Sequence, residues 1–569
     1  MNKKEYSLEK NKSGETVLIE YCGGEEEVVV PRKVKVIGDE AFKYSEKSNI
    51  KSIVLPKGLR RIGASAFDGL NNLTQIELSR ELTEIDSYSF CSCKKLRSIT
   101  LPNNLRRIGQ SAFQGCECLE NIIIPASVTE IGEEAFAYCE NLKSIEVDEG
   151  NRLYASVDGV LYDKNLSTLL MYPPGKKQDI FSVPEGVTAI GENAFKYLNR
   201  PAVVYLPDSL LLIEQNAFEY NSGIVKLNIP DSVTKIGRGA FSNCAKLKNL
   251  VLSKNISVVP QGMIYKCESL RELTVPDGVT KIESTAFYVC ASLERVTIPK
   301  SVVDISSNNF KKCPALKEII VDAENPAYCS VDGVLFSKDR TKMIHKPQGK
   351  HERVCVVPDG VEEIGFRFLG DKSDIERVVL PESVSRICQS AFLDCKALKK
   401  VELPYGLESI GDYAFSCSGI ESLVIPDSVC LIGNYAFYGC KALKSVTFEG
   451  APLIGESAFA NCFALESVTF KRRLKEIGSS AFYWCESLTS VVFPLNKRQS
   501  GDAMQIKSDA FYCCGSLKEI TLPMTKKIDD CGLGFGENGK MEGFIVRGFK
   551  SSAAEQYAKK YGFNFEEIE

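Results

Sequence analysis

The chain has 569 residues, of which 44% are hydrophobic and 25% are charged, a composition that excludes a disordered chain. Its 70 Lys and Arg residues nearly balance its 74 Asp and Glu residues, and the net charge of −4 argues against nucleic acid as the main partner. No run approaches about 18 consecutive apolar residues, so we expect no membrane insertion. Two histidines leave little room for zinc sites or general-base chemistry, so we expect no catalytic centre, no metal and no cofactor.

Residues 1–30 are predicted to form a β-hairpin that caps the rest of the chain. Tyr6 to Leu8 and Val17 to Tyr21 are typical of two strands around a turn at Ser13 and Gly14. The first residues include a Lys pair but not the apolar segment of a signal peptide. We therefore expect a cytoplasmic protein as the sequence stands, and a surface or secreted protein if a signal segment has been trimmed.

Residues 31–525 contain a repeat of 23 residues, which we expect to form one solenoid. A Phe that usually follows Ala, or the residue in its register, recurs 18 times, and most steps are 23 residues long. The positions in this register are 42, 67, 90, 113, 136, 195, 218, 241, 264, 287, 310, 369, 392, 415, 437, 459, 482 and 511.

The unit 276–298 shows the pattern that the repeats follow. Its last residues, 296–298, alternate as a short strand with one buried face. Ala286, Phe287 and Cys290 have the spacing of one short helical turn. Strands separated by such a return can pair in parallel, and these crossovers are right-handed. We therefore predict an α/β solenoid, a right-handed superhelix of about 18 repeats with a parallel β-sheet on one face.

The residue after the core Ile of each unit is usually glycine, as at Gly132, Gly237 and Gly411. A positive φ would explain glycine at this register. Pro260 occupies the same register, however, and proline fixes φ at about −65°. We therefore expect these glycines to allow neighbouring coils to approach closely.

The units 127–147 (SVTEIGEEAFAYCENLKSIEV) and 428–448 (SVCLIGNYAFYGCKALKSVTF) share Val, Ile-Gly, Ala-Phe, Cys-x-x-Leu and a closing strand. This pattern resembles the BspA-like leucine-rich repeats of bacterial proteins, and the resemblance covers about residues 28–525. The resemblance implies a leucine-rich-repeat solenoid. It also implies binding or adhesion in general terms, without a particular ligand.

Two long steps of 59 residues predict insertions near 148–183 and 322–357. The insertions match each other at an offset of 174 residues, as YASVDGVLYDKN (154–165) against YCSVDGVLFSKD (328–339). Asp-Gly between apolar residues predicts a hairpin turn, so each insertion is expected to form a β-ribbon that projects from the solenoid. The ribbon can be a ligand-contacting arm or a spacer that covers a coil end.

Residues 526–569 are predicted to form a closing cap. Residues 543–547 are typical of a strand, Ser551 and Ser552 of a helix N-cap, and 553–560 of a helix that stops at Gly562. Residues 563–568 can add a last strand. The run 534–540 resembles a phosphate-binding loop, but Met541 stands where Ser or Thr is needed, so we interpret it as a flexible loop.

Twelve of the 22 cysteines stand three residues after the Phe register. Neighbouring cysteines in this column are close enough for disulfides, but the inward position favours a buried ladder of thiols, which suits a reducing cytosol. We assign to this ladder Phe113, Cys116, Phe136, Cys139, Phe241, Cys244, Phe287 and Cys290. The pairs Cys91/Cys93 and Cys116/Cys118 are the nearest approach to metal-ligand spacing and have no His nearby in the sequence.

Two surfaces are candidates for interaction. The outward positions of the predicted sheet are small and polar, with Tyr205 as the only aromatic residue, and aromatic residues gather just after the Phe register. This second set is either an interaction patch or packing between coils. The candidate residues are Tyr205, Tyr438, Tyr483, Trp484, Tyr512, Ser445, Thr447, Ser467, Thr469 and Ser490.

We therefore expect a non-catalytic protein that binds a protein or glycan partner. An adhesin for host or matrix proteins is one alternative. An enzyme with a site at an insertion or in the C-terminal loop is another, with His345, His351 and Lys540 as its residues. We expect the two histidines to be solvated loop residues.

Overall fold

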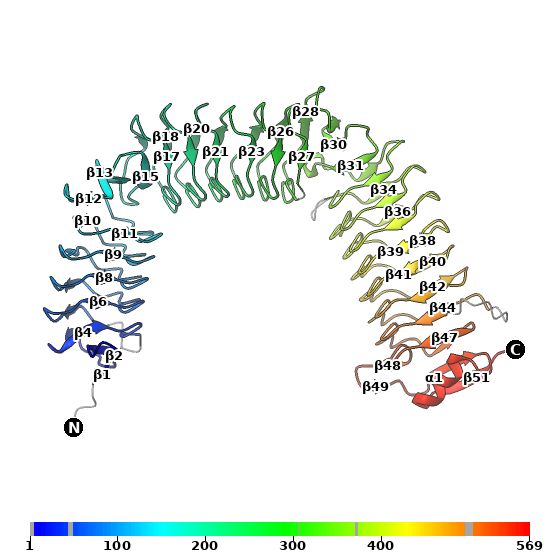
Figure 1. Ribbon diagram of the computed structural model, residues 1–569. Coiled ribbons are helices and arrows are strands. Elements are labelled where there is room, and N and C mark those ends of the chain that lie inside the picture. Colours follow the sequence, from blue (N-terminus) through cyan, green and yellow to red (C-terminus); the bar gives the residue numbers. More distant parts are fainter. Residues whose placement is uncertain (1–4, 44–48, 307, 370–373, 496–503) are drawn as a thin grey trace. The chain divides into compact units, whose positions relative to one another are not determined.

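The computed structural model describes residues 5–43, 49–306, 308–369, 374–495 and 504–569 (Figure 1). The chain divides into two compact units, Met1–Cys290 and Ala291–Glu569, which we describe separately. In the described residues, no helix is both long and apolar enough to cross a membrane.

Unit 1 is a stack of coils in which most coils contribute two strands, one to each of two sets of parallel sheets (Figure 1). The first set, which we call the long-strand face, has strands of three or four residues: β3 Glu27–Val29, β5 Ser52–Val54, β7 Gln75–Glu77, β10 Asn121–Ile124, β12 Ser144–Val147, β16 Ile180–Ser182, β18 Val203–Tyr205, β20 Lys226–Asn228, β22 Asn249–Val251 and β24 Glu272–Thr274.

The second set, which we call the short-strand face, has mostly strands of two residues. In unit 1 these are β4 Val34–Ile37, β6 Arg61–Ile62, β8 Glu84–Ile85, β9 Arg107–Ile108, β11 Glu130–Ile131, β17 Ala189–Ile190, β19 Leu212–Ile213, β21 Lys235–Ile236, β23 Val258–Val259 and β25 Lys281–Ile282. The hairpin β1 Tyr6–Lys10 and β2 Thr16–Tyr21 is antiparallel, and β2 pairs in parallel with β4.

Unit 2 repeats both faces. Its long strands are β26 Arg295–Ile298, β28 Glu318–Val321, β32 Val354–Val356, β34 Arg377–Val379, β36 Lys400–Glu402, β38 Ser422–Ile425, β40 Ser445–Phe448, β42 Ser467–Phe470, β44 Ser490–Val492 and β46 Glu519–Thr521. Its short-strand face contains β27 Asp304–Ile305, β33 Glu363–Ile364, β35 Arg386–Ile387, β37 Ser409–Ile410, β39 Leu431–Ile432, β41 Leu453–Ile454, β43 Glu476–Ile477, β45 Met504–Ile506 and β47 Thr525–Ile528.

The predicted solenoid with parallel sheets is confirmed, but the predicted helical turn at Ala-Phe is wrong. This segment is a run of turns in which positive φ recurs two residues before and two residues after the Phe, as at Ser111 (51°) and Gly115 (71°) around Phe113. An α-helix needs negative φ throughout. The backbone of these turns forms hydrogen bonds with the next coil instead. For example, the Phe113 N–H donates to the carbonyl of Ala135 at 2.8 Å.

Close approach of coils explains the glycines after the core Ile, as the sequence predicted. A Cβ on Gly132 would lie 2.4 Å from the Gln110 backbone nitrogen, and one on Gly237 would lie 2.2 Å from the Gln215 nitrogen. Neither glycine has a positive φ. A side chain at either of these two positions would force the neighbouring backbone to shift.

Each insertion forms a β-ribbon followed by one further coil. The first contains β13 Tyr154–Val157, β14 Val160–Asp163 and β15 Thr168–Met171, and the second contains β29 Tyr328–Val331, β30 Val334–Ser337, β31 Lys342–His345 and the 3-10 turn η1 Gln348–Lys350. In the first ribbon, β15 joins the short-strand face by pairing in parallel with β17. In the second, β31 pairs with β33 in the same way.

The ribbons do not project, which corrects the expectation from the sequence. The Ile145 amide donates to the carbonyl of Gly159 at 2.9 Å, so the first ribbon lies against β12. The Ile319 amide donates in the same way to Gly333 at 3.0 Å. Tyr172 and Lys346 occupy the Phe register of the inserted coils. Over the described ranges the solenoid has about 23 turns, so the sequence count of 18 repeats is not confirmed.

The C-terminal segment of unit 2 extends the sheet of β46 by two strands with a helix between them. β50 Ile545–Gly548 and β51 Asn564–Glu567 extend the parallel sheet of β46, and α1 Ala553–Tyr561 runs between them. Ser552 accepts a hydrogen bond from the Glu555 amide at the start of α1, and Gly562 ends the helix at φ 69°. The Tyr557 hydroxyl donates to the Leu533 carbonyl at 2.8 Å and holds α1 against the last coil.

Candidate functional site

The Phe and Cys columns lie in the dry core. Phe113, Phe136, Phe241, Phe287 and the cysteines three residues after each of them are fully buried. Each thiol donates to the Phe-register carbonyl of the preceding coil, as Cys139 Sγ does to the Phe113 carbonyl at 3.1 Å. Asn221 occupies the same register and donates from Nδ2 to the Phe195 carbonyl at 3.0 Å. The register therefore takes a small side chain that can donate a hydrogen bond.

These thiols are poor nucleophiles. Burial raises the pKa of Cys139, Cys267 and Cys514 to about 12, so each stays protonated near neutral pH. A protonated thiol is what the hydrogen bond to the Phe-register carbonyl requires.

The aromatic residues after the Phe register do not form one continuous track. Tyr483 stacks on Tyr512, with ring centroids 5.4 Å apart, and lies 6.2 Å from Trp484. The coil between Tyr438 and Tyr483 has Ala460 at the equivalent position, so no aromatic ring bridges the two tyrosines. Tyr438 contacts Tyr435 instead, with ring centroids 5.7 Å apart. All four predicted residues of this set are half-buried.

The predicted serines and threonines form two columns on the long-strand face of unit 2. Ser445, Ser467 and Ser490 pair in direct register, and Thr447 pairs with Thr469 in the next column. All five are half-buried. Tyr205 lies on the long-strand face of unit 1 and is 58% exposed.

The long-strand faces carry exposed apolar side chains that the sequence interpretation missed when it described the sheet as small and polar. Val29 is 62% exposed and pairs directly with Val54, which is 54% exposed. Val356 is 65% exposed. The sequence does show Val or Ile at outward positions of these strands. The high β propensity of Val and Ile is enough to explain them there, so the pattern did not by itself indicate a binding surface. Further exposed residues of this kind are Ile123, Ile180, Val251, Ile320, Val354, Val424 and Val492.

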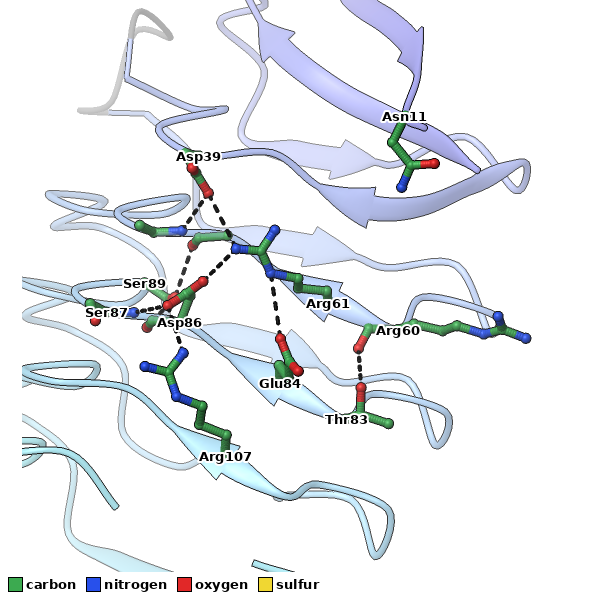
Figure 2. Close-up of polar contacts among 12 residues, drawn as sticks. Asn11, Asp39, Arg60, Arg61, Thr83, Glu84, Asp86, Ser87, Ser89 and Arg107 are labelled. Carbon is green, nitrogen blue, oxygen red and sulfur yellow. Dashed lines mark hydrogen bonds and ion pairs between the residues drawn. The ribbon is translucent and has the colours of Figure 1, made fainter. Parts of the chain in front are cut away.

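A ladder of alternating charge crosses the short-strand face of unit 1 (Figure 2). Arg61, Glu84, Arg107 and Glu130 stand in direct register, and Asp86 accepts from Arg61 Nη2 at 2.5 Å and from Arg107 Nη1 at 3.1 Å. Burial would raise the pKa of the Asp86 carboxyl, but the hydrogen bond and charge of Arg61 outweigh burial and lower it. These charges satisfy one another, so the ladder stabilises the coils.

Two equivalent cavities lie under the two ribbons. The first, in unit 1, has a volume of about 240 Å³ and the second, in unit 2, about 340 Å³. Their walls contain four matched pairs of residues at the offset of 174: Ile131 and Ile305, Tyr154 and Tyr328, Leu161 and Leu335, Leu170 and Ile344. The matched tyrosines hold each ribbon to the coil below, since Tyr154 Oη accepts from the Ile131 amide at 3.2 Å and Tyr328 Oη from the Ile305 amide at 3.1 Å.

The family model for the BspA type leucine rich repeat region matches residues 17–152, 175–290, 259–330, 362–489 and 452–532. The chain belongs to this family. A comparison with curated protein sequences gives no match. Leucine-rich repeat proteins bind proteins and are typically non-catalytic.

Solved structures that resemble this BspA-type chain include several bacterial leucine-rich repeat proteins. They include a leucine rich cell surface protein from Faecalibacterium prausnitzii (26% identity, 57% of this chain and 94% of that chain, TM-score 0.38). Another is the pneumococcal vaccine antigen PcpA (19% identity, 74% of this chain and 98% of that chain, TM-score 0.45). A third is a leucine-rich repeat protein from Eubacterium ventriosum (22% identity, 57% of this chain and 92% of that chain, TM-score 0.41).

The two histidines of this BspA-type protein lie apart in different surroundings. His351 is exposed and its Nδ1 lies 2.9 Å from Asp374 Oδ2. His345 is buried at the end of β31 beside Phe310, which corrects the expectation of a solvated loop residue. Burial lowers the pKa of His345 to about 4, so its imidazole is neutral at neutral pH.

The residues proposed for metal or phosphate chemistry are not arranged for it. Within the described ranges, no three His, Cys, Asp or Glu residues come together as metal ligands would. The segment 534–540 is not a flexible loop, because β48 Phe535–Gly536 and β49 Gly539–Lys540 pair as an antiparallel hairpin. The Lys540 ammonium lies 5.0 Å from the centre of the Phe563 ring and contacts the Gly562 carbonyl.

Proposed function

We propose that this chain is a non-catalytic binding protein that presents its long-strand faces to a protein or glycan partner. The observation that carries the proposal is the set of exposed Val, Ile and Tyr side chains at outward positions of these strands. Val29 and Val54 form one such pair, and Val356 and Tyr205 are more than half exposed. Burying a Val side chain against a partner contributes at most about 1.5 to 3 kcal/mol, and association itself costs about 4 to 15 kcal/mol, so several of these side chains must be covered together for a stable contact.

The polar residues of these faces supply the rest of the contact. Ser and Thr columns such as Ser445 and Ser467 offer hydroxyls at a regular spacing of about 4.8 Å. A regular row of hydroxyls suits the amide groups of a polypeptide and the hydroxyls of a glycan equally. The test therefore includes both kinds of partner.

The proposal is tested with the full chain on a glycan array and on a panel of matrix proteins. Val356→Lys places a charge in the long-strand face, and we expect it to weaken partner binding at least about 10-fold. Leu453→Lys is the matched control, because Leu453 is also an exposed aliphatic residue but lies on the short-strand face. Retention of a matrix protein would favour the adhesin alternative. Equal loss in both variants, or no partner in either panel, would contradict the proposal.

A further inference from the structure

Two residues that line the cavity under the first ribbon each have a buried polar atom without a hydrogen-bond partner among the described residues. We call this cavity the first ribbon cavity, and the two atoms are the hydroxyl oxygen of Tyr172 and Oδ1 of Asn193. Tyr172 is only 1% exposed, and Asn193 is half-buried with its Oδ1 buried. A buried polar atom without a partner costs free energy, and a ligand that supplies the missing hydrogen bond recovers part of this cost.

The group that would satisfy these two oxygens is a hydrogen-bond donor. An amide oxygen such as Asn193 Oδ1 only accepts hydrogen bonds, and a tyrosine hydroxyl accepts as well as donates. A primary ammonium group has three N–H donors and no acceptor, so one such group has enough donors for both oxygens. The pair of oxygens is specific to the first insertion, because Lys346 and Arg367 stand at the equivalent positions of the second.

The charges around the first ribbon cavity favour a cationic ligand. Glu133, Glu134 and Glu192 line the cavity, and Lys196 is the only cation among the described residues that line it. The Lys196 ammonium lies 2.7 Å from Glu134 and 3.0 Å from Glu219, so two carboxylates balance its single charge.

The other two carboxylates of the lining add negative potential. Glu133 and Glu192 are exposed, and neither forms an ion pair within the part of the chain that the structure describes. Glu192 accepts a hydrogen bond from the neutral amide of Gln215 at 2.6 Å, which leaves its charge in place. Water and salt screen exposed charges, so these carboxylates determine the sign of the preferred ligand charge, and the two buried oxygens fix its position.

The first ribbon cavity has the size and walls for a small organic molecule. A cavity of about 150 Å³ holds benzene, so 240 Å³ corresponds to about ten non-hydrogen atoms. Ile131, Leu161, Leu170 and Met171 supply apolar wall. Such walls favour a flat or aliphatic body, and a few polar groups fix its orientation.

We infer that the first ribbon cavity binds a small primary amine in its ammonium form, with an aromatic or aliphatic body and about ten non-hydrogen atoms in all. The ammonium group donates to Asn193 Oδ1 and to the Tyr172 hydroxyl oxygen. The body lies against Leu161, Leu170 and Met171. This site goes beyond the proposed function, since it needs no macromolecular partner and stands if partner binding fails.

The test is calorimetric titration of the full chain at neutral pH with phenethylamine, phenethyl alcohol and phenylacetate, which have similar bodies and differ in charge. We expect phenethylamine to bind at least about 10-fold more tightly than the alcohol and the carboxylate, the size of a lost charge-assisted hydrogen bond. Equal binding of the three compounds, or no binding of phenethylamine at millimolar concentration, overturns the inference.

Asn193→Asp should strengthen binding, because it keeps an acceptor oxygen at this position and adds a negative charge. Asp suits the site, since Asn193 has φ 60° and Asp is one of the residues that adopt this conformation. We expect phenethylamine to bind at least about 5-fold more tightly and phenethyl alcohol to change less than about 2-fold. Asn216→Asp is the control, because Asn216 stands 23 residues later at φ 54° outside the cavity lining, and it should change neither by more than about 2-fold. Unchanged phenethylamine binding in Asn193→Asp contradicts the inference.

Tyr172→Phe removes the other oxygen and keeps the ring. We expect phenethylamine binding to fall at least about 5-fold in this variant. Hydrogen exchange without ligand shows separately that the coil around Tyr172 is folded, so a loss of binding reports on the hydroxyl. Undiminished phenethylamine binding overturns the inference, and this criterion also decides if Asn193→Asp does not fold.

Discussion

Replacing Cys139 tests whether the cysteine column exists for its hydrogen bond or only for its size. In Cys139→Ala the buried Phe113 carbonyl loses the thiol donor that lies 3.1 Å away but keeps the Cys116 amide as a donor at 3.1 Å. Losing one of its two hydrogen bonds costs about 0.5 to 1.5 kcal/mol, and the small void left by the sulfur adds about 1 kcal/mol. Cys139→Ser keeps a donor, so we expect it to be more stable than the Ala variant by about 1 kcal/mol.

Hydrogen exchange read by mass spectrometry is the appropriate assay, because a long repeat protein does not unfold in two states. We expect the coil 127–147 to lose about 10-fold or more in protection in the Ala variant and clearly less in the Ser variant. Cys430→Ala is the control, because Cys430 is exposed. If the Ala variant is as well protected as the Ser variant, the column needs only a small apolar residue and the reasoning is refuted.

Three further changes test the buried polar groups. The pKa of His345 is about 4 in the folded chain and about 6.5 in the unfolded chain. As the pH falls from about 6.5 to about 4, the unfolded chain takes up the proton first. The free energy of unfolding therefore falls by up to about 3 kcal/mol. His345→Met, which installs the residue of the first ribbon, should remove this pH dependence of exchange in β31; a slope that persists contradicts the assignment. Asp86 has a lowered pKa, so its contribution is present above about pH 4 and is lost as the pH falls through the folded pKa. Asp86→Asn should cost about 1 to 2 kcal/mol at pH 7 by the same assay, and this cost should shrink as the pH falls through the folded pKa of Asp86; a cost that does not change with pH would refute the ion pairing. Tyr172→Phe removes a buried hydroxyl without a partner among the described residues and should stabilise its coil by about 1 kcal/mol, whereas a loss of protection would reveal a partner.

The sequence predicted the features that every coil must share. Phe113 and Cys116 recur at a fixed period because each coil buries the same face against the next, and Gly132 recurs because backbones meet there. The second strand was missed, since two residues such as Lys281 and Ile282 are too few to show alternation. The spacing of Ala, Phe and Cys predicted a helical turn, because residues such as Ser111 give no sign in the sequence of the positive φ that they adopt.

The candidate sites were harder to predict because they depend on packing between segments far apart in sequence. The inserted coils were not recognised as repeats, because they have Tyr172 and Lys346 in place of the Phe that marks the register. Each cavity combines a ribbon with coils on both sides of it, and its charge depends on residues such as Arg367 that have no special sequence context. The offset of 174 between the insertions was the one signal that could have located both cavities.

Hydrogen exchange of the full chain with and without a captured partner tests the binding role of the long-strand faces most directly. Our account predicts that added protection falls on peptides of the long strands, such as Ser422–Ile425 and Ser445–Phe448, and that the turns around the Phe register are unchanged. Protection confined to those turns or to the short strands would contradict it.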